Sequence, residues 1–419
     1  MSATAAGVAA TRPTVLERVR RVPAVAILAE RSYQSFWIAA VLAAAVQELR
    51  IMAQSWLILD TGAAQVWVGL AVGLTAVPAV PLVLFSGVLA DNRGGRYALV
   101  VSRVALVLAS VAMAVVVLMG DPELWQIVVL GVAGSAAIAF GMGPTQTMAT
   151  ALVARPHLQA AASLNSMSFS LARAVGPLTG GVLIASFGIG SPFLALCGLA
   201  MLALFFTLRI REPSRDAVAQ GSPWLKVREG FAYVRQDATV RWLLTLALFL
   251  LMAFTWLAVL PVYARDVLHV GEKGYATLLA TFAAGQGISA LYVAVTGGFS
   301  RKGVAVVVSA VAWSLAAIVF GYSHSYPLSL GMMFVLGIVP PIWVSSLVTL
   351  LQISTPKDKV GRVMSLFALT VQIAQLSWLI GTGLGQMVGN ATMIAITLGA
   401  FATANLLALV RSPQLRVKT

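Results

Sequence analysis

The stretch Gly87-Val88-Leu89-Ala90-Asp91-Asn92-Arg93-Gly94-Gly95-Arg96 separates two long apolar runs, residues 66–90 and 97–119. Each run is long enough to cross a bilayer, which needs about 20 apolar residues per helix. The polar and glycine residues 91–96 between the runs predict a tight turn, because Gly94 and Gly95 allow backbone angles that other residues avoid. Basic residues mark the cytoplasmic side of membrane proteins, and residues 87–103 carry Arg93, Arg96 and Arg103. Asp91 alone would be a turn residue that balances these arginines.

The composition excludes most soluble protein classes. The chain has 419 residues, of which 59% are hydrophobic and only 10% are charged, whereas a soluble domain carries about 25% charged residues. A single cysteine, Cys197, excludes an internal disulfide framework and a thiolate metal site. The sequence contains neither a metalloprotease motif, a nucleotide-binding loop nor a nucleophile elbow. We therefore expect a polytopic membrane protein with no cofactor, no metal and no catalytic residues.

The apolar runs divide the chain into two similar halves. Spans are predicted at residues 36–59, 66–90, 97–119, 124–151, 162–187, 191–208, 240–262, 275–297, 304–322, 328–351, 363–388 and 392–410. The fold class is therefore an all-α membrane protein with twelve transmembrane helices in two six-helix halves. The expected segments are a cytoplasmic N-terminal segment (1–31), an N-terminal half (32–210), a cytoplasmic linker (211–238), a C-terminal half (239–411) and a cytoplasmic tail (412–419).

Charged residues are distributed unevenly about these spans. The formal net charge is +14, and most Lys and Arg fall in one set of connections and the two termini, which the positive-inside rule places in the cytoplasm. The linker shows apolar residues at helical spacing (Trp224, Val227, Phe231 and Val234), which predicts an amphipathic helix at the membrane interface. The basic connections favour contact with anionic lipid, and no nucleic-acid partner is expected because the basic residues are not clustered with aromatic ones.

Span one contains polar residues near its middle. Gln47, Arg50 and Gln54 fall on one helical stripe, whereas Glu48 lies about 160° around the helix from Arg50. A charged residue at a helix centre costs about 3 kcal/mol, so such residues usually face a cavity or a partner. Two interpretations stay open: a substrate cavity, or a buried network that locks helices together. Glu48, the only acid inside a predicted span, is the candidate for carrying a coupling proton.

Spans five and eleven supply the other candidates. Span five carries Arg173, which could pair with Glu48 or bind an anion, and small residues on one stripe that allow close helix packing. Span eleven carries an amide-rich stripe that includes Gln372 and Gln375. The candidate substrate-binding residues are therefore Gln47, Arg50, Gln54, Arg173, Gln372 and Gln375. We expect Arg50→Ala to weaken binding, most for anionic substrates.

The opening stretch resembles the signature loop of the major facilitator superfamily of transporters, Gly-x-Leu-Ala-Asp-Arg-x-Gly-Arg-Lys-x-x-Leu. Matching positions are Gly87, Leu89, Ala90, Asp91, Gly94, Arg96 (for Lys) and Leu99, while Asn92 and Gly95 stand where the family usually has basic residues. The resemblance implies that Asp91 faces the start of the eleventh helix and holds the inner side closed. Gly176-Pro177-x-x-Gly180-Gly181 resembles the antiporter motif of exporters in this superfamily. The implied gating residues are Gly87, Asp91, Arg93, Gly94, Arg96, Gly176, Pro177 and Gly180.

The whole chain resembles the enterobactin-exporter and macrolide-efflux branch of the superfamily, through segments 56–62, 161–166 and 361–365 and the Gly-Pro motif. The resemblance implies alternating access and export of small amphipathic molecules, of drug or siderophore type, driven by proton antiport across the cytoplasmic membrane. The expected partners are a small-molecule substrate, protons and membrane lipids, and the protein is expected to act as a monomer. Alternatives are a lipid flippase or facilitator on the same scaffold and, in a different class, a membrane-embedded enzyme.

Overall fold

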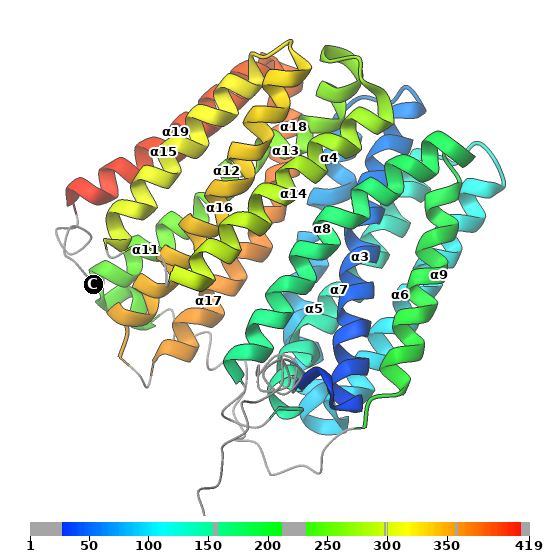
Figure 1. The fold of residues 1–419 in the computed structure, drawn as a ribbon, viewed down its shortest axis with the longest axis horizontal. Coiled ribbons are helices and arrows are strands. Elements are labelled where there is room, and N and C mark those ends of the chain that lie inside the picture. The colour runs from blue at the N-terminus through cyan, green and yellow to red at the C-terminus, as the bar shows by residue number, and fades with distance from the viewer. Residues whose placement is uncertain are drawn as a thin grey trace, which may run out of the picture.

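The computed structural model describes residues 27–153, 158–211, 232–296, 299, 301–356 and 359–411. Helices and short connections account for this part of the chain, with no strand in it, so the predicted all-α class is confirmed. The helices run side by side in two bundles (Figure 1). The amphipathic helix predicted in the linker falls largely within residues 212–231, outside the described residues.

The N-terminal bundle, here called the N-half, runs from Arg31 to Leu208. Its helices are α3 (Arg31–Asp60), α4 (Val66–Gly73), α5 (Ala76–Arg93), α6 (Gly95–Leu118), α7 (Leu124–Ala151), α8 (Leu158–Phe187) and α9 (Ser191–Leu208). The second predicted span is broken between α4 and α5. Pro78 explains the break, because proline has no N–H to donate to the carbonyl of Leu74 four residues earlier.

The C-terminal bundle, the C-half, repeats this plan with more interruptions. Its elements are α11 (Ala238–Leu248), α12 (Leu250–Ala253), α13 (Thr255–Val262), the π-helix η2 (Tyr263–Val267), α14 (Gly271–Thr296), α15 (Lys302–Gly321), α16 (Tyr326–Ser354), α17 (Val360–Ile373), the 3₁₀ turn η3 (Ala374–Leu376), α18 (Ser377–Val388) and α19 (Asn390–Arg411). Three consecutive elements, α11 to α13, together with η2 form the predicted seventh span, and α17 to α18 form the eleventh.

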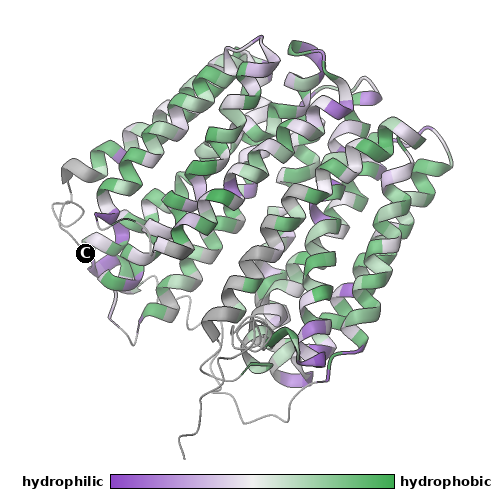
Figure 2. Ribbon diagram, viewed as in Figure 1, coloured by the Kyte–Doolittle hydropathy of each residue, from purple (hydrophilic) through white to green (hydrophobic). Residues whose placement is uncertain are grey.

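Ten helical segments within the described residues are long and apolar enough to cross a membrane. The other two predicted spans correspond to α8 and to the run from α17 to α18, which are helical but are not among those ten. The chain is therefore a multi-pass helical membrane protein, and the count of twelve spans stays a prediction. Hydrophobic residues cover the length of the helices, whereas hydrophilic residues gather towards the ends of the bundles (Figure 2).

The turn predicted for residues 91–96 is wrong in its extent. Helix α5 continues through residues 91–93, and α6 begins at Gly95, so Gly94 alone separates the two helices. Gly94 has φ 107° and ψ 145°, a conformation that a side chain would disfavour. One residue in this conformation is enough to reverse the chain, so Gly95 starts a helix instead of extending the turn.

The two halves meet mainly at one end of the molecule. We call this the distal end: there residues 61–65 join α3 to α4. The opposite end, where α9 ends and α11 begins, is here called the linker end. Each half has its own apolar core, but Met52, Trp56 and Ile184 of the N-half belong to the C-half core. In return, Ala258, Val262 and Trp378 pack into the N-half core. Because most of these residues lie in the distal parts of their helices, burial of apolar surface holds the distal ends of the halves together.

Candidate functional site

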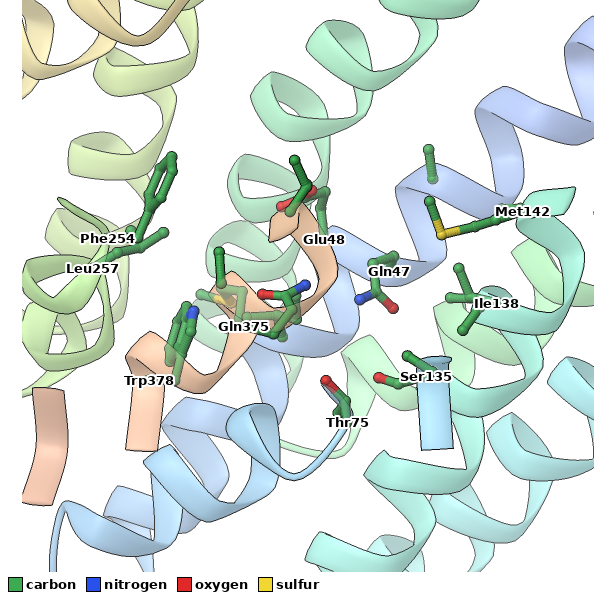
Figure 3. A pocket seen from close by; sticks show the side chains of 18 of the residues that line it. Gln47, Glu48, Thr75, Ser135, Ile138, Met142, Phe254, Leu257, Gln375 and Trp378 are labelled. Carbon is green, nitrogen blue, oxygen red and sulfur yellow. The ribbon is translucent and has the colours of Figure 1, made fainter. Parts of the chain in front are cut away.

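A cavity of about 400 Å³ lies between the two halves. Helix α3 contributes a stripe at helical spacing, formed by Ala40, Ala43, Ala44, Gln47, Glu48, Ile51 and Met52. Residues of α7 and of the C-half face this stripe, with Gln375 and Trp378 opposite Ser135 and Ile138 (Figure 3). The polar lining residues are Gln47, Glu48, Thr75, Arg103, Ser135, Thr145, Ser168, Tyr275, Gln375 and Ser377. A cavity of this size with mostly apolar walls and a few polar groups is typical of a small-molecule site.

Polar contacts between the halves close the distal end of the cavity. The amides of Gln65 and Asn390 bond reciprocally, at 3.0 Å from Gln65 Nε2 to Asn390 Oδ1 and 3.2 Å from Asn390 Nδ2 to Gln65 Oε1. Arg265 of η2 donates from Nη1 to the carbonyl oxygen of Leu59 at 2.5 Å. Both contacts join the end of α3 or its following connection to the C-half.

Close packing of α4 on α18 supports the same closure. A Cβ atom added at Gly69 would lie 2.7 Å from the carbonyl oxygen of Trp378, and one at Gly73 would lie 2.9 Å from Leu379 Cβ. The two backbones can approach this closely only because these positions lack side chains. At the other end of the molecule α5 contacts α17.

The glycines of α8 bring this helix against α3 and α14. A Cβ atom at Gly176 would lie 3.0 Å from Glu48 Cβ, and one at Gly180 would lie 2.7 Å from Leu49 Cδ1. Gly181 faces Ala276 of α14 in the C-half. The predicted close approach of this small-residue stripe is confirmed, and α8 therefore links the helix that carries Glu48 to the opposite half.

Arg50 is the centre of a buried network. Its side chain is only 4% exposed and donates to Gln54 Oε1 at 2.7 Å, to Gln47 Oε1 at 3.1 Å and to the hydroxyl of Ser135 on α7. Gln54 in turn donates to the carbonyl oxygen of Ile127 at 2.9 Å. The sequence predicted that Gln47, Arg50 and Gln54 share a stripe, and the network confirms this. Arg50 and Gln54 lie behind the cavity wall, whereas Gln47 and Ser135 form part of it.

Glu48 lies on the cavity wall beside Gln47, whereas Arg50 itself lies behind the wall. Glu48 is the only carboxylic acid among the described lining residues. Tyr275 of α14 lines the same cavity from the opposite half. Tyr275 is buried and stacks on Trp56 with 5.8 Å between ring centroids. Glu48 therefore lies on a surface that both halves form.

Several candidate residues have side chains outside the described part of the structure. Arg173 and Pro177 lie in α8, Gln372 lies in α17, and Gly87 and Asp91 lie in α5. Their predicted roles stay predictions. Gln375, in contrast, is described and lines the cavity from η3.

Arg93 and Arg96 are the two basic residues of the signature loop, and the structure shows a contact for each side chain. Arg93 lies over the ring of Tyr97, with 5.5 Å from Cζ to the centroid. Arg96 donates from Nη2 to the carbonyl oxygen of Leu208 at 2.8 Å, which ties the start of α6 to the end of α9. Both contacts lie within the N-half.

Arg103 corrects one sequence prediction. The sequence grouped it with Arg93 and Arg96 as a marker of the cytoplasmic side, although it falls within the predicted span 97–119; it lies within α6, is 5% exposed and lines the cavity. Its polar neighbours in the opening stretch made it look like part of the loop, although a helix that starts at Gly95 already encloses it. Ser135, Tyr275 and Phe254 were also missed, because an isolated serine or aromatic residue in an apolar run carries no signal of which face it occupies.

Comparison with known proteins identifies the family. Residues 36–381 match the profile of the Major Facilitator Superfamily. The chain belongs to this superfamily. The chain is therefore a membrane transporter and not an enzyme, as the sequence predicted. Among curated relatives, it is 26% identical over 306 residues to the enterobactin exporter EntS of Citrobacter koseri, and 25% identical over 306 residues to that of Shigella flexneri, with 72% of each chain covered.

Solved structures share this superfamily fold. The nucleoside transporter NupG superimposes with a TM-score of 0.70 at 12% identity, covering 92% of this chain and 100% of that one. A bacterial homologue of the human lysosomal transporter Spinster, in an inward-facing conformation, gives a TM-score of 0.65 at 15% identity, with 94% and 96% covered. A D-xylose–proton symporter gives 0.66 at 14% identity, with 92% and 98% covered. At these identities the likeness concerns the fold alone.

Proposed function

We propose that this transporter is a proton-coupled exporter of small amphipathic molecules, of drug or siderophore type, that works by alternating access. One observation carries the proposal: a cavity between two halves, closed at one end, has mostly apolar walls and a single described carboxylic acid, Glu48. The likeness to enterobactin exporters supports export as the direction. The distal contacts fit a state in which the cavity faces the cytoplasm. The halves that rock about it are residues 32–210 and 239–411.

Reconstituted protein tests this function directly. Purified protein in proteoliposomes should drive a substrate from a panel of drugs and siderophores uphill when a pH gradient is imposed, and collapse of the gradient with an uncoupler should abolish the accumulation. A second candidate, a lipid flippase, is favoured by the apolar cavity walls. Movement of fluorescent phospholipid between leaflets without a pH gradient, in the absence of uphill transport, would replace the exporter with the flippase.

The proposed location is the cytoplasmic membrane, with both termini and the linker in the cytoplasm. In a background without Cys197, an impermeant maleimide applied to intact cells should label Lys273→Cys, which is exposed at the start of α14. The same reagent should label Ser214→Cys in the linker only after permeabilisation. The prediction rests on the excess of Lys and Arg on the linker side. Labelling of Ser214→Cys alone in intact cells would reverse the topology.

Asp91 is proposed to stabilise the closed inner side, together with Gly87 and Gly94 of the signature loop. Helix α5 contacts α17, and the N-terminus of α17 favours a nearby carboxylate by about 0.3–1 kcal/mol. Asp91→Asn should therefore lower the population closed at the linker end about two- to fivefold. Spin labels at Asn92 and Lys359 report this population as a distance distribution, with Asp121→Asn at the distal end as the control. An unchanged distribution with unchanged transport would remove Asp91 from the gate.

A further inference from the structure

Arg103 is a buried cation that faces the cavity and that no role assigned so far explains. It follows the start of α6 at Gly95 by eight residues, which corresponds to about 12 Å along a helix. Its side chain is 5% exposed and lines the cavity between the halves. A cation at this depth in a membrane is unfavourable unless it has a partner. The groups that contact Arg103 therefore show how far the protein itself balances this charge.

Few described groups bind the Arg103 guanidinium. Nη1 donates to the hydroxyl of the adjacent Ser102 at 3.2 Å, whereas Nε is buried and has no hydrogen-bond partner. Among the described side chains the one ion pair within 4.0 Å joins Arg265 to Asp266. A guanidinium offers five N–H donors, so most of its capacity remains for a ligand.

The packing of α6 on α7 holds the Arg103 guanidinium and the Ser102 hydroxyl in place. The hydroxyl of Ser102 donates to the carbonyl oxygen of Ala137 at 2.8 Å. A Cβ atom at Gly141 would lie 3.2 Å from Arg103 Nη1, so the glycine leaves room for the guanidinium against α7. The site is therefore built by two helices of the N-half and is not an accident of one flexible side chain.

The position of Arg103 along α7 separates it from the Arg50 network. Ser135, which accepts from Arg50, and Gly141, which faces Arg103, are six residues apart, or about 9 Å on a helix. Of the two arginines, Arg103 lies nearer the linker end. Its donors thus serve the cytoplasmic part of the cavity, while the facing C-half contributes apolar and aromatic walls that include Phe254, Leu257 and Trp378.

We propose that Arg103 is the anion-recognition residue of this cavity, and that its ligands are amphipathic organic anions. The guanidinium would bind a carboxylate or another planar oxyanion by paired hydrogen bonds, while the apolar body packs against the C-half walls. The proposal rests on the proposed function, because it names the substrate class of the same cavity. It differs from the role of Arg50, whose Nη1 and Nη2 atoms donate to Gln54, Gln47 and Ser135 of the protein itself.

Equilibrium dialysis with matched probes tests the proposal. Radiolabelled 1-naphthoate and 1-naphthamide have the same apolar body and differ in charge. Purified protein in lipid nanodiscs, without any gradient, should bind the carboxylate at least tenfold more tightly than the amide. Arg103→Gln should abolish this preference while changing the affinity for the amide by less than twofold. Arg103→Lys, which keeps the charge, should retain part of the preference.

The control is Arg241→Gln, which removes an exposed arginine at the start of α11 and should leave the preference intact. Because the readout is a ratio of two affinities within one preparation, partial unfolding of a variant lowers both and does not imitate the effect. Equal binding of the two probes by the unaltered protein, binding of neither, or a preference that survives in Arg103→Gln would overturn the proposal. Export of neutral molecules would be unaffected by that outcome, so the proposed function is tested separately.

Discussion

Glu48→Gln is expected to abolish the dependence of uphill transport on an imposed pH gradient while substrate binding is retained. Glutamine has the shape of the protonated glutamate but cannot release a proton, so it fixes one of the two charge states of the cavity. In the unaltered protein, loss of the proton restores a negative charge on the wall of a cavity that both halves line, including Tyr275 of the opposite half. The two charge states would therefore favour different arrangements of the halves.

The measurement is accumulation in proteoliposomes with and without a pH gradient, with substrate binding determined in parallel. Glu30→Gln is the matched control, because Glu30 precedes the same helix and is exposed; its gradient dependence should equal that of the unaltered protein. If Glu48→Gln still moves substrate uphill in response to the gradient, the proton site lies elsewhere. Asp91 or a carboxylate in a connection would be next, and Glu48 would belong to a structural network.

Arg50→Ala is expected to weaken binding of neutral and anionic substrates alike, about tenfold, because it disturbs the residues that form the cavity wall. Arg50 holds Gln47 and Ser135, both of which line the cavity, so its loss leaves two wall residues without a fixed orientation. This modifies the expectation from sequence, which assigned Arg50 to anions in particular, because the guanidinium lies behind the wall. Arg50→Lys should not restore binding, because an ammonium group cannot reproduce the fork of guanidinium donors.

Stability is expected to fall only modestly in Arg50→Ala. Three hydrogen bonds at about 0.6 kcal/mol each in a membrane protein would be lost, about 2 kcal/mol in total. Dissociation constants and thermal unfolding measured on the same samples separate the alternatives, with Arg241→Ala as the exposed control. Unchanged binding with a large loss of stability would make the network structural, and weakening confined to anions would indicate direct contact.

The sequence predicts well those features that depend on residues near one another in the chain. The helical class and the positions of the spans follow from hydropathy alone. The stripe of Gln47, Arg50 and Gln54 follows from helical spacing, and their hydrogen bonds are indeed between residues three and four positions apart. The close contact made by Gly176 and Gly180 could be expected because a stripe of small residues has few other uses in a membrane helix.

What sequence alone determined, then, is the class of molecule, its family and one cluster of polar residues on α3. Tertiary structure decided which of those residues face the cavity. It placed Glu48 on the wall and Arg50 behind it, joined Gln65 to Asn390 across 325 positions of sequence, and placed Arg103, which the sequence had grouped with the loop arginines, at the cavity. The physical reason is that spacing fixes only the relative directions of side chains on one helix. Which direction is the cavity depends on how α3, α6 and α7 pack against the other half, and that is set by contacts between residues far apart in the chain.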